Sequence, residues 1–377
     1  MIRTIFGLVG TPVLFLVGIA VARGQAETKP PLSEEAFKNI QVLKGISVSE
    51  FMDTMGFFSA SLGENCTFCH VEQSGGNWDR YADDNARKRT ARRMITMVSN
   101  LNKANFGGAR MVTCYSCHRG LDRPKITPSL DELYGPPLPD DPDQISAAPG
   151  AAPADQILDK YIQAIGGAQR LEGLNRFIAK GTYQGYAETE TSSLELFAQA
   201  PNQRTLVIHT PNGDNTTTYD GRGGWTAAPQ TERPVTLLPL SGATLDSARL
   251  DAELAFPRLI KQAFSQWRVG FPVMMDKRTV DVVQGSKPGS PPVKFYFDRE
   301  SGLLVRLVRY SNTVVGLSPT RVDYSDYREV AGTKMPFRWI VTWLDGRSTI
   351  ELTEVQPNVA LDAAKFARPV PTAPRGK

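Results

Sequence analysis

Histidine and cysteine are scarce in this sequence, which has three of the former and four of the latter among 377 residues. Long apolar runs are scarce too: only residues 4–22 form one, which excludes a protein with several membrane-spanning helices. Neither sign of charge dominates, since 43 basic and 39 acidic residues leave a net charge of +4, and no long basic run favours nucleic-acid binding. The 41% of hydrophobic residues can build packed cores, and at ~150 residues per domain the length predicts two or three domains.

Residues 1–26 have the features of an export signal. Arg3 precedes the apolar run, and the small residues Gly24 and Ala26 follow it, with cleavage expected after Ala26. An uncut membrane anchor is the alternative, because 19 uncharged residues approach the ~20 that span a bilayer, although Pro12 weakens such a helix. Both alternatives predict a periplasmic protein, either free or anchored to the inner membrane.

A second change of composition covers residues 124–153, where proline, alanine, glycine and aspartate dominate. Such a segment offers few side chains for a core and predicts an extended, semi-rigid linker. It divides the chain into an N-terminal module over residues 30–123 and a C-terminal module over residues 154–368.

The N-terminal module contains two C-x-x-C-H pentapeptides, at residues 66–70 and 114–118. This motif attaches c-type haem: the two thiols form thioethers to the vinyl groups on one porphyrin edge, and the histidine that follows binds the iron. A redox disulfide or a four-thiolate zinc site is the alternative. Both pairs, however, precede one of only three histidines, and no cysteine is left over. The motifs predict two covalent haem c groups on Cys66, Cys69, Cys114 and Cys117, with His70 and His118 as axial ligands.

The usual second axial ligand is methionine. Residues 47–62 have helical apolar spacing, with Ser47 and Glu50 in the positions of a capping box and Met55 on the apolar face. Residues 90–101, before the second motif, repeat this pattern with Met94 and Met97 on one face. A methionine-bearing helix before each motif predicts methionine ligation, by Met55 at the first haem.

The runs MGFFSASLGENCTFCH, ARRMITMVSNLN and MVTCYSCHRG resemble the cytochrome c subunit of photosynthetic reaction centres. The likeness covers residues 36–125, enough for two haems of that four-haem subunit. It implies Met55 and Met94 as axial ligands, with Met97 as the alternative to Met94. No histidine between Met94 and Cys114 offers a different ligand, so both haems are expected to be His/Met.

Aromatic and basic side chains near the motifs have expected roles as well. Phe57, Phe58, Phe68 and Tyr115 are expected to pack on the porphyrins. The basic run at residues 87–93 either pairs with haem propionates or forms a solvated helix face.

The C-terminal module begins with a predicted amphipathic helix over residues 155–165, which Gly166 and Gly167 end. Ten strand-like runs come after it, at 176–186, 193–199, 205–210, 216–220, 279–283, 293–298, 303–310, 321–327, 336–343 and 348–352, and a helix is expected over 248–267. The pattern predicts an α+β module with a curved antiparallel sheet and helices packed on one face.

Residues 219–225, 296–303 and 326–337 of this module resemble hairpin turns of the periplasmic lipoprotein carriers (LolA/LolB-like). That likeness implies an open β-barrel with a helical lid, whose hollow holds acyl chains. His209, at a strand end, is expected to be structural, and no catalytic constellation is evident.

These observations predict a multidomain, non-enzymatic dihaem cytochrome that carries electrons between redox partner proteins. The alternatives are a peroxidase-like haem enzyme, which needs an open iron position, and a lipid- or protein-binding carrier with an accessory redox module. Docking at a membrane, an acyl chain or a partner protein is expected of the β module. Residues 27–130 are expected to fold and keep their spectrum without it.

The haem count is directly testable. Intact-mass measurement of the denatured protein, produced by export in a cytochrome-maturing host, should show two haem additions per chain, because thioethers survive denaturation. Removing both cysteines of one motif should leave one addition. A single addition on the unmodified chain would contradict the prediction.

Overall fold

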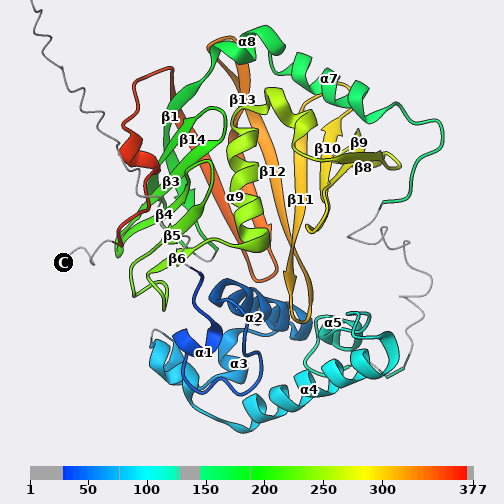
Figure 1. The fold of residues 1–377 in the computed structure, drawn as a ribbon, viewed down its shortest axis with the longest axis vertical. Helices are drawn as coiled ribbons and strands as arrows, with labels where there is room; N and C mark the ends of the chain where they lie inside the picture. The colour runs from blue at the N-terminus through cyan, green and yellow to red at the C-terminus, as the bar shows by residue number, and fades with distance from the viewer. Residues whose placement is uncertain (1–28, 76, 125, 128–144, 187, 372–377) are drawn as a thin grey trace, which may run out of the picture.

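The computed structural model describes residues 29–75, 77–124, 126–127, 145–186 and 188–371. A helical part formed by the N-terminal region lies against one end of a large sheet that carries helices of its own (Figure 1). The apolar run at residues 4–22 and most of the predicted linker lie outside the described residues. Within the described ranges, no helix is long and apolar enough to cross a membrane.

The helical part confirms both helices expected before the motifs. Ser47 begins the first by accepting a hydrogen bond from the Glu50 amide at 3.2 Å, and Asn85 begins the second, earlier than expected, by accepting from the Lys88 amide at 2.9 Å. Its segments are α1 (Ser33–Ala36), α2 (Val48–Leu62), α3 (Cys66–Cys69), η1 (Glu72–Ser74), η2 (Trp78–Ala82), α4 (Ala86–Phe106) and α5 (Cys114–His118).

The sheet has fourteen strands in the described residues, and every pairing in it is antiparallel. All ten strand-like runs are strands. The strands are β1 (Arg176–Gln184), β2 (Ser192–Gln199), β3 (Gln203–Thr210), β4 (Gly213–Tyr219), β5 (Gly224–Ala227), β6 (Leu237–Pro239), β7 (Gln266–Val269), β8 (Val273–Met275), β9 (Arg278–Ser286), β10 (Val293–Asp298), β11 (Leu304–Thr313), β12 (Gly316–Val330), β13 (Thr333–Trp343) and β14 (Gly346–Pro357).

The strand order makes the sheet open. It runs β6-β5-β4-β3-β2-β1-β14-β13-β12-β11-β10-β9-β7, with β8 also paired to β9, so β6 and β7 end the sheet without pairing to each other. The first strand lies beside the last, because β1 pairs with β14. The predicted open antiparallel sheet is therefore confirmed.

Four helical segments of this part cover one face of the sheet: α7 (Ala154–Ala164), α8 (Ala168–Gly173), α9 (Gly242–Leu254) and η3 (Pro257–Gln262). The turn η4 (Ala363–Phe366) lies on the opposite face, where the Lys365 carbonyl accepts a hydrogen bond from Thr205. The helix expected over residues 248–267 is wrong in its bounds: α9 begins earlier, and Pro257 starts a separate turn because a proline disfavours helical backbone in the residue before it.

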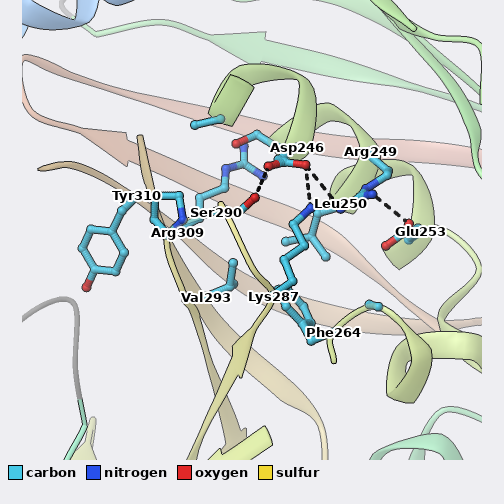
Figure 2. Close-up of a pocket in the computed structure, with 14 residues that line it drawn as sticks. Asp246, Arg249, Leu250, Glu253, Phe264, Lys287, Ser290, Val293, Arg309 and Tyr310 are labelled. Atoms are coloured by element: carbon cyan, nitrogen blue, oxygen red, sulfur yellow. Dashed lines mark hydrogen bonds and ion pairs between the residues drawn. The ribbon is translucent and has the colours of Figure 1, made fainter. Parts of the chain in front are cut away.

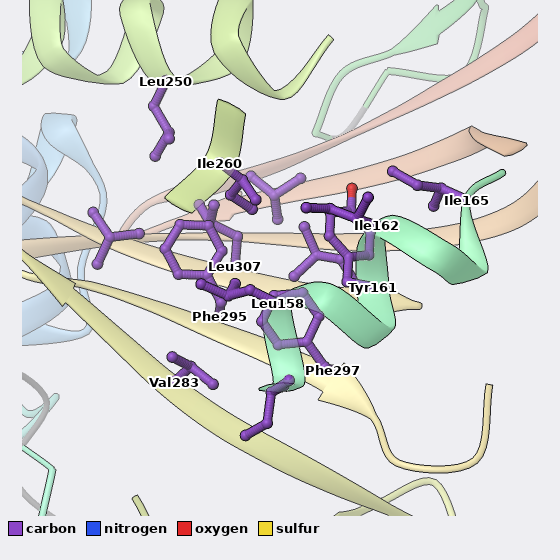
Figure 3. Packing of buried hydrophobic residues seen from close by; sticks show 14 of the residues in the cluster. Leu158, Tyr161, Ile162, Ile165, Leu250, Ile260, Val283, Phe295, Phe297 and Leu307 are labelled. Carbon is purple, nitrogen blue, oxygen red and sulfur yellow. The ribbon is translucent and has the colours of Figure 1, made fainter. Parts of the chain in front are cut away.

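The largest apolar core lies between α7 and strands β9 to β12 (Figure 3). Its members include Leu158, Tyr161 and Ile162 from α7 and Ile165 directly after it, which face Phe295, Phe297 and Leu307 from the sheet. Each fully buried side chain of this size contributes about 1.5–3 kcal/mol to folding, so this contact fixes α7 on the sheet.

The space under α9 is closed by polar contacts (Figure 2). The Asp246 carboxylate accepts hydrogen bonds from Lys287 at 2.6 Å and Ser290 at 2.7 Å, and Asp251 pairs with Arg309 at 2.5 Å. A cavity of about 30 Å³, room for about one water molecule, remains beside these contacts. A larger cavity of about 410 Å³ lies between the start of α9, helix α2 and the adjoining ends of the sheet strands.

One part of the predicted linker is attached to the sheet. Ile145 is buried beside Gly270, and Ala147 forms a β-bridge to the same glycine. Residues 145–148 therefore extend the C-terminal module rather than the linker.

Helix α2 packs against the tips of two hairpins of the sheet, β11–β12 and β13–β14 (Figure 1). Phe57 is buried there against Gly316, and Ser311 donates to the Asp53 carboxylate at 3.1 Å. Arg110, before the second motif, donates to the Thr313 carbonyl. Phe57 thus packs on the sheet and not on a porphyrin as expected. Residues 27–130 alone would expose its ring.

The hairpin contact can be tested with Phe57→Ala. This change should lower the free energy of unfolding of the holoprotein by about 3 kcal/mol, because it leaves a cavity at a buried aromatic position. Tyr186→Ala, at an aromatic side chain that is 70% exposed, is the control and should cost less than about 0.5 kcal/mol. Urea titration followed by tryptophan fluorescence measures both. Equal effects would mean that α2 does not pack on the hairpin.

Candidate haem-binding site

The first attachment motif forms a single helical turn, α3, and its last residue leaves that turn. The His70 amide donates to the Cys66 carbonyl at 3.0 Å, so Cys66 and Cys69 occupy positions i and i+3 of the turn, which lie on one side of a helix. Cys66 is exposed and Cys69 is half-buried. Both thiols are free, as attachment to a porphyrin edge requires.

The ring of His70 is oriented by η2. Its Nδ1 lies 3.0 Å from the Tyr81 carbonyl oxygen. Because a carbonyl oxygen can only accept, Nδ1 carries the proton and Nε2 keeps its lone pair. Burial lowers the pKa of His70, and the charge on Lys88 lowers it further. The imidazole is therefore held neutral, the form that binds a metal ion.

The second motif repeats this arrangement. Thr113 and Ser116 cap helix α5 reciprocally: the Ser116 amide donates to the Thr113 hydroxyl at 3.3 Å, and the Thr113 amide donates to the Ser116 hydroxyl at 3.0 Å. His118, at the end of this helix, has Nδ1 2.9 Å from the Leu121 carbonyl oxygen. Its Nε2 is consequently also left as the metal-binding nitrogen.

Side chains from the start of α4 hold the backbone of the first motif. Asn85 donates to the Cys69 carbonyl at 2.8 Å and Lys88 to the Tyr81 carbonyl at 2.6 Å. Arg87 donates to the Phe68 carbonyl at 3.1 Å and lies over the Phe68 ring at 4.0 Å. Within the basic run, Arg87 thus binds the motif backbone, a role that the sequence pattern did not predict.

The loop before the second motif is held by Asn102, a buried residue of α4. Its side-chain amide donates to the Val112 carbonyl at 2.7 Å, and its carbonyl oxygen accepts from the Val112 amide at 3.0 Å. Asn102 satisfies both backbone groups of Val112 two residues before Cys114. Nothing in the sequence pattern marked this residue.

The candidate methionines lie on the two expected helices. Met55 on α2 is half-buried, whereas Met94 and Met97 on α4 are 40% and 49% exposed. Further exposed apolar side chains near the second motif are Met111, Tyr115 and Leu121. So many exposed apolar side chains within two short segments are unusual in a soluble protein, and they fit a porphyrin, which would cover them.

The geometry does not favour the alternatives to haem. Burial raises the pKa of the Cys114 thiol to about 11 and also raises the pKa values of Cys66 and Cys69. A redox-active cysteine pair needs a lowered thiol pKa instead. The four thiols do not converge either: among the described residues, no three His, Cys, Asp or Glu side chains form a group suited to a metal ion.

His209, the third histidine, is structural as expected. Its Nδ1 bonds the Asp214 carboxylate at 2.8 Å, and Glu195 lies 3.6 Å from its Nε2. It belongs to β3 in the sheet, and neither attachment motif contacts it through these bonds.

The model of the family described as "Photosynthetic reaction centre cytochrome C subunit" matches residues 18–132. The photosynthetic reaction center cytochrome c subunit of Thermochromatium tepidum is 40% identical over 119 residues, which are 30% of this chain and 28% of that protein. The corresponding subunit of Rubrivivax gelatinosus is 34% identical over 110 residues, 28% of either chain. The chain thus spans less than a third of the length of these relatives. Its N-terminal region carries the cytochrome c domain of this family, which confirms the resemblance.

The C-terminal part matches solved structures at low identity. A LolA superfamily protein from Nitrosomonas europaea is 13% identical, with a TM-score of 0.39, and the match covers 58% of this chain and 98% of that one. A DUF1329 family protein from Desulfovibrio piger is 11% identical, with a TM-score of 0.42 and the same coverage. The strand order alone establishes that the sheet is open.

Asn102→Ala tests the support of the second motif. It should cost about 2–3 kcal/mol of stability, because it leaves two backbone groups of Val112 without partners, and it should raise the fraction of chains that carry one haem. Thermal unfolding and intact mass measure the two effects. Asn100→Ala, at an exposed position of the same helix, is the matched control and should change neither. If both variants behave alike, Asn102 does not hold the loop.

Proposed function

We propose that this chain is a dihaem c-type cytochrome that transfers electrons between redox partner proteins and is not an enzyme. The proposal rests on the orientation of the two motif histidine rings. Each directs Nδ1 at a backbone carbonyl, of Tyr81 at 3.0 Å and of Leu121 at 2.9 Å, so that each Nε2 is left to bind iron. The same arrangement occurs twice, each time one residue after a pair of free thiols.

A bound haem supplies a reversible one-electron change at its iron. The chain would hold one haem through Cys66, Cys69 and His70, and the other through Cys114, Cys117 and His118. The carbonyl bonds at Nδ1 fix the plane of each imidazole and make its Nε2 a stronger donor. Because these partners are backbone atoms, the rings would keep their orientation whether the bound iron is oxidised or reduced.

Met55 would supply the second axial ligand of the first haem. At the second haem we assign Met94, with Met97, one turn further along α4, as the alternative. A thioether ligand raises the reduction potential and completes the coordination of the iron. Complete coordination favours electron transfer over a peroxidase-like reaction.

We further propose the organisation in which these groups operate. Residues 1–26 direct export to the periplasm, either as a cleaved signal or as an anchor in the inner membrane. Residues 30–123 form the dihaem domain, residues 124–153 connect it to the sheet, and residues 154–368 form the LolA/LolB-like domain. The electron donor and acceptor would meet the chain outside the cytoplasm.

Met55→Ala tests the first ligand. The substitution should lower the midpoint potential of one haem, remove its weak absorption near the red end of the oxidised spectrum, and let the reduced protein bind carbon monoxide. Met52→Ala, an exposed methionine of the same helix, should leave all three properties unchanged. Carbon monoxide binding that is equal in the two variants, or absent from both, would exclude Met55 as a ligand.

The second ligand is tested by Met94→Ala and Met97→Ala, compared in the same way. We expect Met94→Ala to open the second haem to carbon monoxide and Met97→Ala to leave it closed. The reverse result would assign Met97. If neither variant binds carbon monoxide, the second haem is not held by a methionine of α4.

A further inference from the structure

Helix α4 carries charge of one sign only. Its 21 residues include six cations and no acidic residue; the cations are Arg87, Lys88, Arg89, Arg92, Arg93 and Lys103. The acidic residues just before the helix compensate two of them, because Asp84 pairs with Arg92 at 2.8 Å and both Asp83 and Asp84 attract Lys88. Within the described part of the chain, no other cation of α4 forms an ion pair. Most of the positive charge of this helix is therefore uncompensated.

Three of these cations form a row along one side of α4. Arg89, Arg93 and Lys103 lie within about 80° of one another around the helix axis, and ~21 Å along that axis separates the two ends of the row. All three are exposed, and so are Thr96 and Asn100, which lie between them on the same side. We call Arg89, Arg93 and Lys103 the α4 cation row.

The positions of these cations oppose helix stability. Arg89 lies close to the start of α4, where the positive end of the helix dipole disfavours a cation. Arg89 and Arg93 are four residues apart, so they are neighbours on the helix surface, and like charges at this spacing repel each other. Neither cation serves the stability of the helix, which indicates that another role accounts for them.

The helix that carries the row extends past both attachment motifs. Asn85, which caps α4, donates to the Cys69 carbonyl of the first motif, and Asn102 near its other end holds the loop before the second. Met94 lies between these ends, about 100° or more around the axis from each cation of the row. Figure 1 shows α4 along the bottom of the molecule, on the far side of the helical part from the sheet. A protein bound to the row would therefore lie close to both haems, on a face that the sheet leaves free.

We propose, on the basis of the electron transfer proposed above, that the α4 cation row docks an acidic redox protein. Between its cations the row carries the polar side chains of Thr96 and Asn100, and not the apolar ones that a membrane-binding helix inserts into lipid. A small, polar contact led by charge forms fast and dissociates readily, as an electron carrier that leaves after each transfer requires. In each encounter one electron passes between the partner and a haem iron. One of the two is oxidised and the other reduced, and no covalent bond forms or breaks.

The test is the reduction of the oxidised, full-length holoprotein by reduced flavodoxin, a small acidic electron carrier, in stopped-flow experiments. The second-order rate constant should fall as salt is added, because opposite charges steer the encounter. The variant R89Q/R93Q/K103Q should lower this rate constant by ~10-fold or more at low salt and remove most of its salt dependence. The same variant should be at least as stable to heat as the native protein, since it removes two unfavourable interactions from the helix.

The matched control is R222Q/R268Q/K277Q, which removes three exposed cations of the sheet and should leave the rate constant within ~2-fold of the native value. An equal decrease in both triple variants would overturn the proposal, because net charge alone would then explain it. An uncharged hydroquinone should reduce all three proteins at the same rate. If it does, and flavodoxin also reduces the R89Q/R93Q/K103Q variant at the native rate, the docking site is wrong and the proposed function stands. A native protein that neither reagent reduces would overturn both.

Cross-linking places the contact. A carbodiimide joins carboxylates of flavodoxin to lysine amines, and Lys103 is the one lysine of the row. We expect a flavodoxin adduct on Lys103 in peptide mapping. Lys103→Arg should lose this adduct and keep the rate constant, because the charge remains. Adducts confined to lysines of the sheet would contradict the proposal. Binding of the native chain to anionic vesicles that R89Q/R93Q/K103Q loses, with no change in the flavodoxin reaction, would overturn it in favour of a lipid surface.

Discussion

The approach of Gly63 to Gly120 is the constraint on which the haem region depends. A Cβ atom on Gly63 would lie 2.3 Å from the Gly120 carbonyl oxygen, and the Gly120 amide donates to the Ser61 carbonyl at 2.9 Å. Both glycines have left-handed backbone, with φ of +68° and +83°, where a side chain is also strained. Gly63 ends α2 three residues before Cys66, and Gly120 follows His118 by two. One backbone contact therefore sets the position of each attachment motif relative to the other.

Helix α2 extends this constraint to the sheet. Its C-terminal end meets the turn after the second motif, while Phe57 and Asp53 contact the β11–β12 hairpin, which also receives Arg110 from the loop before that motif. The sheet is thus in contact with the segments that precede both motifs. A linker rich in proline suggests two independent modules, but this hairpin contact makes the C-terminal part a support for the haem region. The fold of the sheet therefore bears on the positions of both attachment motifs even without contributing a residue to them.

How much of the structure could be predicted from the sequence depended on the separation along the chain between the residues that interact. Alternation of polarity identified the ten longer strands, because it reflects a packed face that each strand carries in its own residues. The short strands β5 to β8 have three or four residues and owe their state to partners elsewhere in the sheet. The motif cysteines and histidines follow from covalent spacing. The carbonyls of Tyr81 and Leu121 do not, since any residue supplies a carbonyl, and Phe57 was misassigned because its partner lies more than 250 positions away.

The two attachment motifs also differ in the segments that support their histidines. After His70 the chain forms η1 and η2, whose Tyr81 ring lies 4.8 Å from the His70 ring and stacks on Trp78 at 5.4 Å. Trp78 in turn donates to the Gln230 carbonyl of the C-terminal part at 3.1 Å. After His118 only a turn at residues 119–121 supports the ring. The two histidines therefore differ in how the chain holds them. The first is linked through η2 and Trp78 to the C-terminal part, whereas the second depends on the turn that directly follows it.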